Sequence, residues 1–218
     1  MNRSLAPLRM SDADYERARR VLMRRDPVLG ALIRRIGPCR LHAYRDGDLF
    51  SALVETIVSQ QLSIRVADVI FGRVCALCAP EPHPTPAALR ALTIDQLRAA
   101  GLSRPKASYV HDLADKVASG ALNLEELEHL PDEEVIAALS QVKGIGRWSA
   151  QMILLFRFNR PDVWPTGDLG IVRALERLYR LRKTPSLKRL ERFGEPWRPY
   201  RSVAAWYLWR SLSDKTPL

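Results

Sequence analysis

The stretch Val-Lys-Gly-Ile-Gly-Arg-Trp-Ser-Ala at residues 142–150 is the most informative part of this sequence about its fold. It joins two segments with helical spacing of apolar residues, 131–140 and 147–157. Glycines on both sides of Ile145 allow positive φ and keep side chains away from the backbone, while Ile145 itself can enter the core. The stretch therefore predicts a tight turn inside a helical hairpin of about residues 132–157.

Such a turn presents backbone N–H groups to which a phosphate oxygen can bind. Charged side chains at 143 and 147 strengthen the attraction. We expect the following residues to contact phosphate: Lys143, Gly144, Gly146, Arg147 and Ser149. An ordinary corner between two helices is the alternative, because Gly-X-Gly by itself is common.

The composition is that of a soluble globular protein, with 218 residues, 47% hydrophobic and 27% charged. Uncharged apolar runs such as 152–156 fall far short of the ~20 residues that cross a bilayer, so we expect no membrane span. The first residues lack a secretory signal. Three cysteines are too few for a disulfide framework, which favours a reducing compartment: the cytoplasm, and its nucleoid, if the source is prokaryotic.

Positive charge is concentrated at the two ends of the chain. The formal charge is +6 in residues 1–40, −6 in residues 41–140 and +10 in residues 141–218. A polyanion that faces the terminal segments explains this division, and nucleic acid is favoured over membrane because no basic amphipathic anchor stands alone. A solvated basic face is the alternative.

Every segment with readable periodicity is helical. Capping boxes begin helices at Ser11 and Thr93, and Asp26-Pro27 begins another. Further helices are expected at 48–59, 63–78, 86–91 and 103–119, with a proline-rich loop after the second of these. About ten short helices and no alternating strand predict an all-α protein.

With the hairpin, three further motifs resemble the helix-hairpin-helix (HhH-GPD) superfamily of DNA glycosylases, in its 3-methyladenine DNA glycosylase II branch. Residues 57–63, Ile-Val-Ser-Gln-Gln-Leu-Ser, look like the Ser-Gln-Gln loop of the family. Residues 164–168, Trp-Pro-Thr-Gly-Asp, lie where the family has its catalytic aspartate. Residues 197–202, Trp-Arg-Pro-Tyr-Arg-Ser, match its late motif. The resemblance covers about residues 20–212.

The resemblance implies a compact, two-lobed all-α fold without the extra N-terminal β-domain of some members. One lobe would combine residues 1–42 with 159–218. The other, 43–158, would contain the wedge loop and the hairpin. DNA would lie in the cleft between the lobes.

Asp168 begins a helix, and an N-terminal cap is its ordinary explanation. The resemblance makes it the catalytic carboxylate, and one side chain can serve both purposes. An anion beside the sugar stabilises the positive charge that develops as an N-glycosidic bond breaks, and it can orient the attacking water.

The resemblance also implies the residues that handle the base. The duplex must release the damaged nucleotide, and the loop Gln60-Gln61-Leu62 would fill the gap, with Gln61 or Leu62 as the wedge. Aromatic walls suit a cationic base, and the expected pocket residues are Trp148, Met152 and Trp209. Trp206 is more consistent with the core.

Strand cleavage and metal chemistry are not expected. Relatives that cut the strand have a Schiff-base lysine where this chain has Trp148. No cysteine follows Cys78, so the iron–sulfur ligand set of other members is missing. Cys75, Cys78 and His83 give too few ligands for a metal site. We expect no catalytic cofactor; a monovalent cation at the hairpin carbonyls stays open.

The sequence thus predicts a monomeric, monofunctional glycosylase that excises alkylated bases such as 3-methyladenine and 7-methylguanine from double-stranded DNA. Two alternatives remain. One is a non-catalytic protein that uses the hairpin to bind DNA or recognise damage. The other is a glycosylase for oxidised or mispaired bases.

Overall fold

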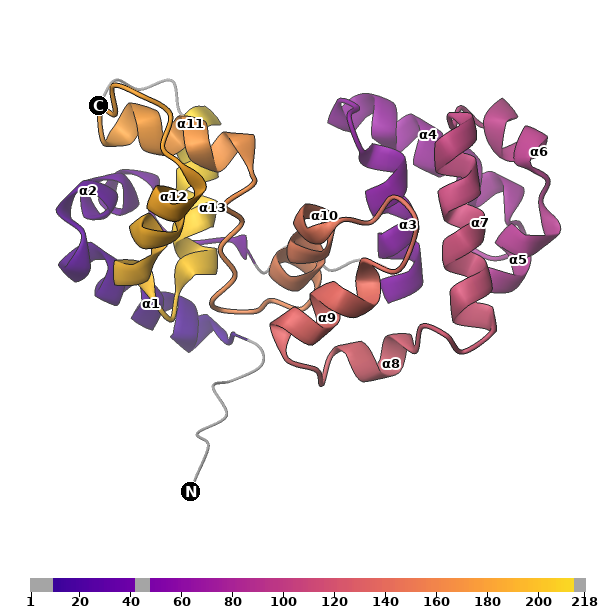
Figure 1. Ribbon diagram of the computed structural model, residues 1–218, viewed down its shortest axis with the longest axis horizontal. Helices are drawn as coiled ribbons and strands as arrows, with labels where there is room; N and C mark the ends of the chain where they lie inside the picture. The colour runs from indigo at the N-terminus through magenta and orange to yellow at the C-terminus, as the bar shows by residue number, and fades with distance from the viewer. Residues whose placement is uncertain (1–9, 42–47, 214–218) are drawn as a thin grey trace. The chain divides into compact units, whose positions relative to one another are not determined.

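The computed structural model describes residues 10–41 and 48–213. Every regular element in these ranges is helical (Figure 1), which confirms the predicted all-α class. The chain divides into two compact units: unit 1, Met1–Tyr44 with Leu154–Leu218, and unit 2, Arg45–Ile153. Our expected divisions were 42/43, which lies outside the described residues, and 158/159. No helix in the described ranges is long and apolar enough to cross a membrane.

Unit 1 is organised around α13 (Arg201–Ser213), whose residues 202–208 are all buried. This helix contacts α1 (Asp12–Arg25), α2 (Pro27–Ile36) and α11 (Leu169–Leu178), as Figure 1 shows. Trp206 is one of its buried residues, as expected. The unit is completed by α12 (Leu187–Gly194) and the 3-10 turn η3 (Glu195–Trp197).

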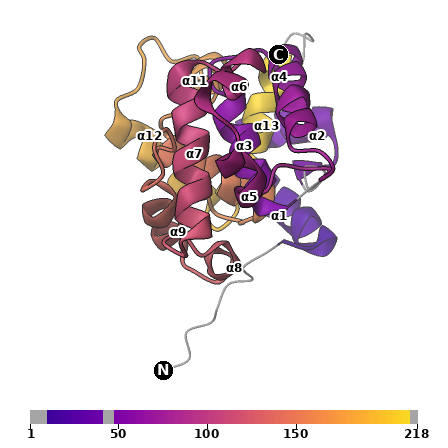
Figure 2. The same ribbon diagram turned by 90° about the vertical axis from the view of Figure 1, so that its right-hand side faces the viewer.

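Unit 2 is organised around the long helix α7 (Arg104–Ala118), which contacts α3 (Leu49–Ser59), α5 (Pro86–Ala91) and α6 (Ile94–Ala99), as Figure 2 shows. The remaining helices of this unit are α4 (Ile64–Leu77), α8 (Leu124–Leu127), α9 (Asp132–Leu139) and α10 (Arg147–Met152).

The predicted helix starts are confirmed by their caps. The Ser11 hydroxyl accepts the backbone N–H of Asp14 and the Asp14 carboxylate accepts that of Ser11. Thr93 and Gln96 form the same reciprocal pair. Asp26 caps α2 directly before a proline. Each cap contributes about 1 kcal/mol to helix stability.

The expectation of one α-helix over 147–157 is wrong. The α-helix ends at Met152 and continues as a π-helical turn, Ile153–Arg157. Three consecutive residues of this turn, Ile153, Leu154 and Leu155, are buried. Burial does not distinguish the two helix types, because the α-helix α13 also buries consecutive residues. Apolar spacing in the sequence therefore does not reveal a change to i→i+5 hydrogen bonds.

Candidate functional site

Asp168 is a buried carboxylate at the start of α11, with 9% of its surface exposed. Its Oδ1 accepts the backbone N–H of Ile171 at 2.8 Å, which is the expected N-terminal cap. The turn at residues 165–168 positions Asp168 at the start of α11, because the Asp168 backbone N–H donates to the Pro165 carbonyl at 3.0 Å. Trp164 anchors this turn through its indole N–H, which donates to the Leu190 carbonyl at 2.8 Å.

The side chain of Trp209 reaches Asp168 from α13. Its indole Nε1–H donates to the same Asp168 Oδ1 at 2.9 Å. On its other side the indole stacks on Phe156, with ring centroids 5.7 Å apart and an interplanar angle of 25°. The structure therefore brings together Asp168 and Trp209, two of the predicted site residues, by a direct hydrogen bond.

Gly170 makes this pair possible, and our sequence reasoning missed it. A Cβ at this position would lie 2.9 Å from Asp168 Oδ1 and 3.0 Å from Trp209 Cδ1. Any side chain would push the indole away from the carboxylate. The sequence did contain a signal for this role of Gly170. A glycine is unusual in the first turn of a helix, and this one lies two residues after the candidate catalytic aspartate.

The hairpin joins α9 to α10 as predicted, with Ile145 buried in the core of unit 2. Gly144 has φ +81°, and a Cβ there would lie 2.1 Å from Cδ2 of Tyr109. Glycine is thus required at 144 for both its conformation and its packing. Gly146 is different: its φ is −96°, so the expectation of positive φ at both glycines is wrong for this one.

Both hairpin cations are engaged with acidic residues. The Arg147 guanidinium donates two hydrogen bonds to Glu133, at 2.8 and 2.6 Å. The Lys143 ammonium lies 3.7 Å from Asp112, which also accepts the Lys143 backbone N–H at 2.9 Å. Both basic side chains are more than half exposed, so a phosphate could exchange with their acidic partners.

These contacts also act on the acidic partners. The hydrogen bond from Arg147, more than any other contact, lowers the pKa of Glu133. Burial acts to raise the pKa of Asp112, but the hydrogen bonds from Lys116 and from the Lys143 backbone outweigh it and the pKa is lowered. The Arg147–Glu133 pair therefore joins the two helices of the hairpin, and the Lys143–Asp112 contact joins the hairpin to α7.

The loop Gln60-Gln61-Leu62 is tied to the hairpin through its first residue. The Gln60 side-chain amide donates to the Gly144 carbonyl at 2.7 Å and to the Ser149 hydroxyl at 3.5 Å. Ser149, one of the predicted phosphate contacts, is buried, and its hydroxyl accepts this bond from Gln60. Gln61, with φ +59°, and Leu62 are exposed, which leaves the two wedge candidates on the surface.

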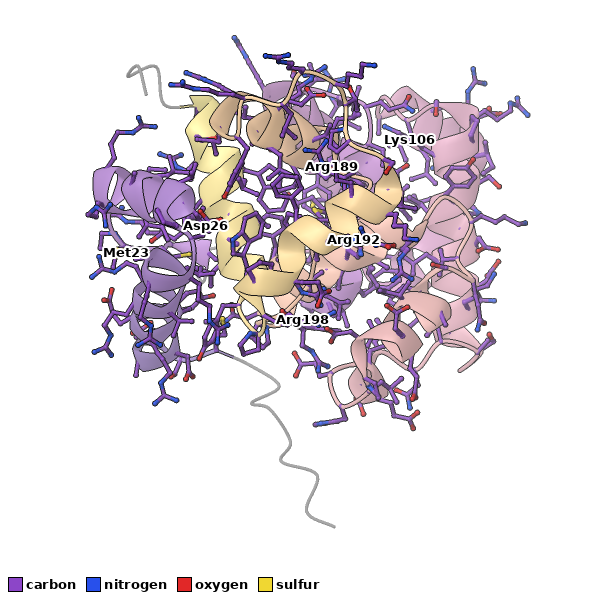
Figure 3. The ribbon with its side chains drawn as sticks, turned by 60° about the vertical axis from the view of Figure 1, so that its left-hand side comes forward. Met23, Asp26, Lys106, Arg189, Arg192 and Arg198 are labelled. Carbon is purple, nitrogen blue, oxygen red and sulfur yellow. The ribbon has the colours of Figure 1, made fainter. Side chains whose placement is uncertain are left out.

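Lys106 supports the same loop and was not predicted. Its ammonium donates to the Val58 carbonyl at 2.8 Å and to the Gln60 carbonyl at 2.6 Å, at the C-terminal end of α3. Lys106 is labelled in Figure 3. Burial lowers the pKa of this lysine. No sequence signal connects it to the loop, because the two lie 46 residues apart.

The remaining predicted pocket residues, Trp148 and Met152, lie four residues apart on α10, and so on one face of that helix. The Trp148 side chain is exposed, at 43%, and Met152 is half-buried. Both belong to unit 2, whereas Asp168 and Trp209 belong to unit 1.

Cys75 and Cys78 are free thiols, the second of them buried. Burial is the main cause of the raised pKa of both. Within residues 10–41 and 48–213, no group of three or more His, Cys, Asp or Glu side chains is arranged to hold a metal ion.

The described part of the chain combines a buried helix-capping aspartate, bonded to an indole, with a Gly-Ile-Gly hairpin in an all-helical fold. Residues 54–199 match the model of the HhH-GPD superfamily base excision DNA repair proteins. The chain belongs to this superfamily, which confirms the resemblance found in the motifs.

Two relatives of this chain have names that refer to glycosylases of alkylated bases. DNA-3-methyladenine glycosylase 1 of Schizosaccharomyces pombe is 38% identical over 170 residues, which cover 77% of this chain and 75% of that protein. The alkylbase DNA glycosidase-like protein mag2 of the same yeast is 29% identical over 201 residues, 91% of this chain and 94% of that protein.

A solved structure shares the fold. The Schizosaccharomyces pombe 3-methyladenine DNA glycosylase Mag1, determined in complex with abasic DNA, superposes with a TM-score of 0.82 at 33% identity. The match covers 91% of this chain and 98% of that one.

Proposed function

We propose that this protein is a DNA glycosylase of base excision repair that hydrolyses the N-glycosidic bond of alkylated bases, such as 3-methyladenine and 7-methylguanine, in double-stranded DNA. Its membership of the HhH-GPD superfamily and the names of its relatives support this function. They favour alkylated bases over oxidised or mispaired ones, and an enzyme over a protein that only binds.

The observation that carries the proposal is the fixed orientation of Asp168. Two N–H donors, from Ile171 and Trp209, hold Oδ1 in place. A carboxylate that is already oriented needs little reorganisation when positive charge develops on the sugar, and this is how preorganised electrostatic catalysis lowers a barrier. The same carboxylate would orient the water that attacks the sugar carbon.

The substrate supplies the rest of the driving force. A purine alkylated at N3 or N7 is cationic and leaves as a neutral base, so a strong general acid is not needed. Trp148 stands where relatives that cut the strand have their Schiff-base lysine. The product is then an intact strand with an abasic site, and the enzyme is monofunctional.

The hairpin and the loop would engage the DNA. Backbone N–H groups of the turn at Gly144 and Gly146 would bind phosphate, with Lys143 and Arg147 exchanging their acidic partners for it. Gln61 or Leu62 would enter the duplex after the nucleotide has left the base stack, at a cost of a few kcal/mol. Trp148, Met152 and Trp209 stay predictions for the base pocket, as does a monovalent cation at the hairpin carbonyls. We expect a monomer that needs no catalytic cofactor.

Asp168→Asn tests the catalytic assignment. Asparagine caps a helix as well as aspartate does, so the fold and DNA binding should survive. We expect the single-turnover rate of 7-methylguanine release to fall by at least ~100-fold. Asp48→Asn is the matched control, because Asp48 caps α3 in the same way at 2.8 Å from the Ser51 N–H, and its rate should stay at the wild-type value.

Two results would overturn the proposal. Release of 7-methylguanine by Asp168→Asn at the wild-type rate would remove Asp168 from the chemistry. Release of 8-oxoguanine or uracil, but not of methylated purines, by the wild-type protein would change the substrate class. Borohydride trapping should give no covalent adduct with abasic DNA, and an adduct would contradict the monofunctional assignment.

A further inference from the structure

Residues 180–192 form a strongly basic segment between the end of α11 and the end of α12. Six of its 13 residues are cationic and Glu191 is its one anion. All six cations are exposed: Arg180, Arg182, Lys183, Lys188, Arg189 and Arg192. Arg189 and Arg192, labelled in Figure 3, lie three residues apart and therefore on one face of α12. We call this stretch the basic segment.

The cations of the basic segment differ from those of the hairpin in their ion pairs. Among the described residues, none of the six takes part in an ion pair, whereas both hairpin cations do. Like charges three and four residues apart repel each other and disfavour a helix. A bound polyanion would reduce the repulsion between the cations of the basic segment.

The basic segment is nevertheless held firmly in place. Tyr179, just before it, packs edge-on against Phe193, just after it, with ring centroids 5.2 Å apart. Leu190 is buried and its carbonyl accepts the Trp164 indole N–H at 2.8 Å. At Gly194, a Cβ would lie 2.8 Å from Trp164 Nε1, so the end of α12 fits closely against this indole. The cations therefore stand on a fixed surface and not on a loose tail.

The division of charge between the units indicates where a polyanion is attracted. Unit 2, which contains the hairpin, has 10 Lys and Arg against 14 Asp and Glu, a formal charge of −4. Unit 1 has 24 against 10, a formal charge of +14. The hairpin unit repels DNA at long range, so most of the attraction must come from unit 1.

We infer that the basic segment is a binding surface for the phosphate backbone of duplex DNA and supplies a large part of the sequence-independent affinity of this protein. In naming duplex DNA as the partner we rely on the proposed glycosylase function. Contacts to phosphate carry no base information, so this surface would hold undamaged and damaged DNA alike.

A fourfold neutralisation tests the inference on the full-length protein. The variant combines Arg182→Gln, Lys183→Gln, Arg189→Gln and Arg192→Gln. The measurement is the Kd for an undamaged duplex at several KCl concentrations. Each lost phosphate contact lowers the slope of log K against log salt by ~0.9. We expect affinity to fall by about tenfold or more and the slope to fall by roughly 2 to 4.

The matched control removes four exposed arginines from elsewhere in unit 1, with the same change of net charge: Arg17→Gln, Arg24→Gln, Arg34→Gln and Arg40→Gln. Its affinity should fall by less than about threefold, since only long-range attraction is lost. Equal losses in both variants, or no loss in the first, would overturn the inference. Both variants must melt at the wild-type temperature.

Two more measurements separate the possible failures. The single-turnover rate of 7-methylguanine release at saturating enzyme should be unchanged in the fourfold variant. If the wild-type protein released no base, the proposed function would be wrong. The Kd values for undamaged duplex would still test whether the basic segment binds DNA. If the variant lost binding to phosphatidylglycerol vesicles but bound DNA as wild type does, the basic segment would be a membrane surface and the inference would be wrong.

Discussion

Asp168 and the hairpin are both held by hydrogen bonds, but of opposite kinds. Asp168 is buried and is held by a backbone N–H and an indole N–H, neither of which bears a charge. The hairpin cations are exposed and are held by carboxylates. The first arrangement fixes the position of Asp168 Oδ1 by two uncharged donors. The second can be exchanged for a phosphate, and salt weakens it.

Gly144→Ala should have the largest effect on the hairpin side of this comparison. The new methyl group would meet the Tyr109 ring at 2.1 Å, and φ +81° disfavours any L side chain. We expect the free energy of unfolding to fall by ~2 kcal/mol or more, together with a loss of DNA affinity. Urea denaturation and binding to an undamaged duplex would measure the two effects.

Gly146→Ala is the control for that substitution. A Cβ at 146 would have no atom within 4 Å, and φ is −96°. The free energy of unfolding of this variant should therefore lie within ~1 kcal/mol of the wild-type value. If the two variants were equally unstable, the requirement for glycine at 144 would not come from Tyr109 or from φ.

Trp209→Phe tests the Asp168 side. Phenylalanine can stack on Phe156 but has no N–H for Asp168 Oδ1. A hydrogen bond to a carboxylate contributes ~1.5 to 3 kcal/mol, so we expect single-turnover release of 7-methylguanine to slow by roughly 10- to 100-fold. Affinity for undamaged DNA should not change.

Trp206→Phe provides the comparison, because Trp206 lies on the same helix, is buried, and makes its closest ring contact with Tyr207. A similar loss of rate in this variant would mean that Trp209 acts only through the packing of α13.

Glu133→Gln should have the smallest effect, and in the opposite direction. The substitution releases Arg147 from its carboxylate and removes one negative charge beside the turn. An exposed pair of this kind is worth a few tenths of a kcal/mol, so DNA affinity should rise by about twofold. Glu134→Gln removes the same charge without touching Arg147, and a matching rise there would assign the effect to net charge alone.

The same pair predicts a dependence on pH. Arg147 lowers the pKa of Glu133 in the folded state. The contribution of the Glu133–Arg147 pair to stability is therefore complete above the ordinary glutamate pKa of 4.5. It is lost as pH falls through the lowered value. The small stability difference between wild type and Glu133→Gln should therefore disappear in acid, as thermal melts across that range would show.

Local signals account for what the sequence predicted well. Ser11, Asp26 and Thr93 bond to N–H groups within three residues, so their caps are visible in a short window. The order of the motifs was enough to identify the superfamily and the alkylated-base branch, and both are supported by the relatives.

Other features depended on partners that are distant in the chain. Arg147 was predicted to contact phosphate, and the sequence did not reveal that Glu133, 14 residues earlier, pairs with it. A positive φ was expected at both hairpin glycines, but of the two only Gly144 adopts it. The π-helical turn after Met152 escaped prediction because apolar spacing does not report which hydrogen bonds a helix makes.

The sequence by itself determined most of the helices and the hairpin turn, because caps and turns rest on neighbours a few positions away. It also placed Asp168 at the start of a helix, and the proposed catalytic role of that residue came from the resemblance to the family. Only the tertiary structure decided that the Trp209 indole, 41 residues from Asp168, fixes that carboxylate, and that Gly170 makes room for it. It also showed that the hairpin cations are paired, whereas the described residues contain no ion pair for the cations of the basic segment. Contacts across such separations arise from packing, and no pattern in a short window records them.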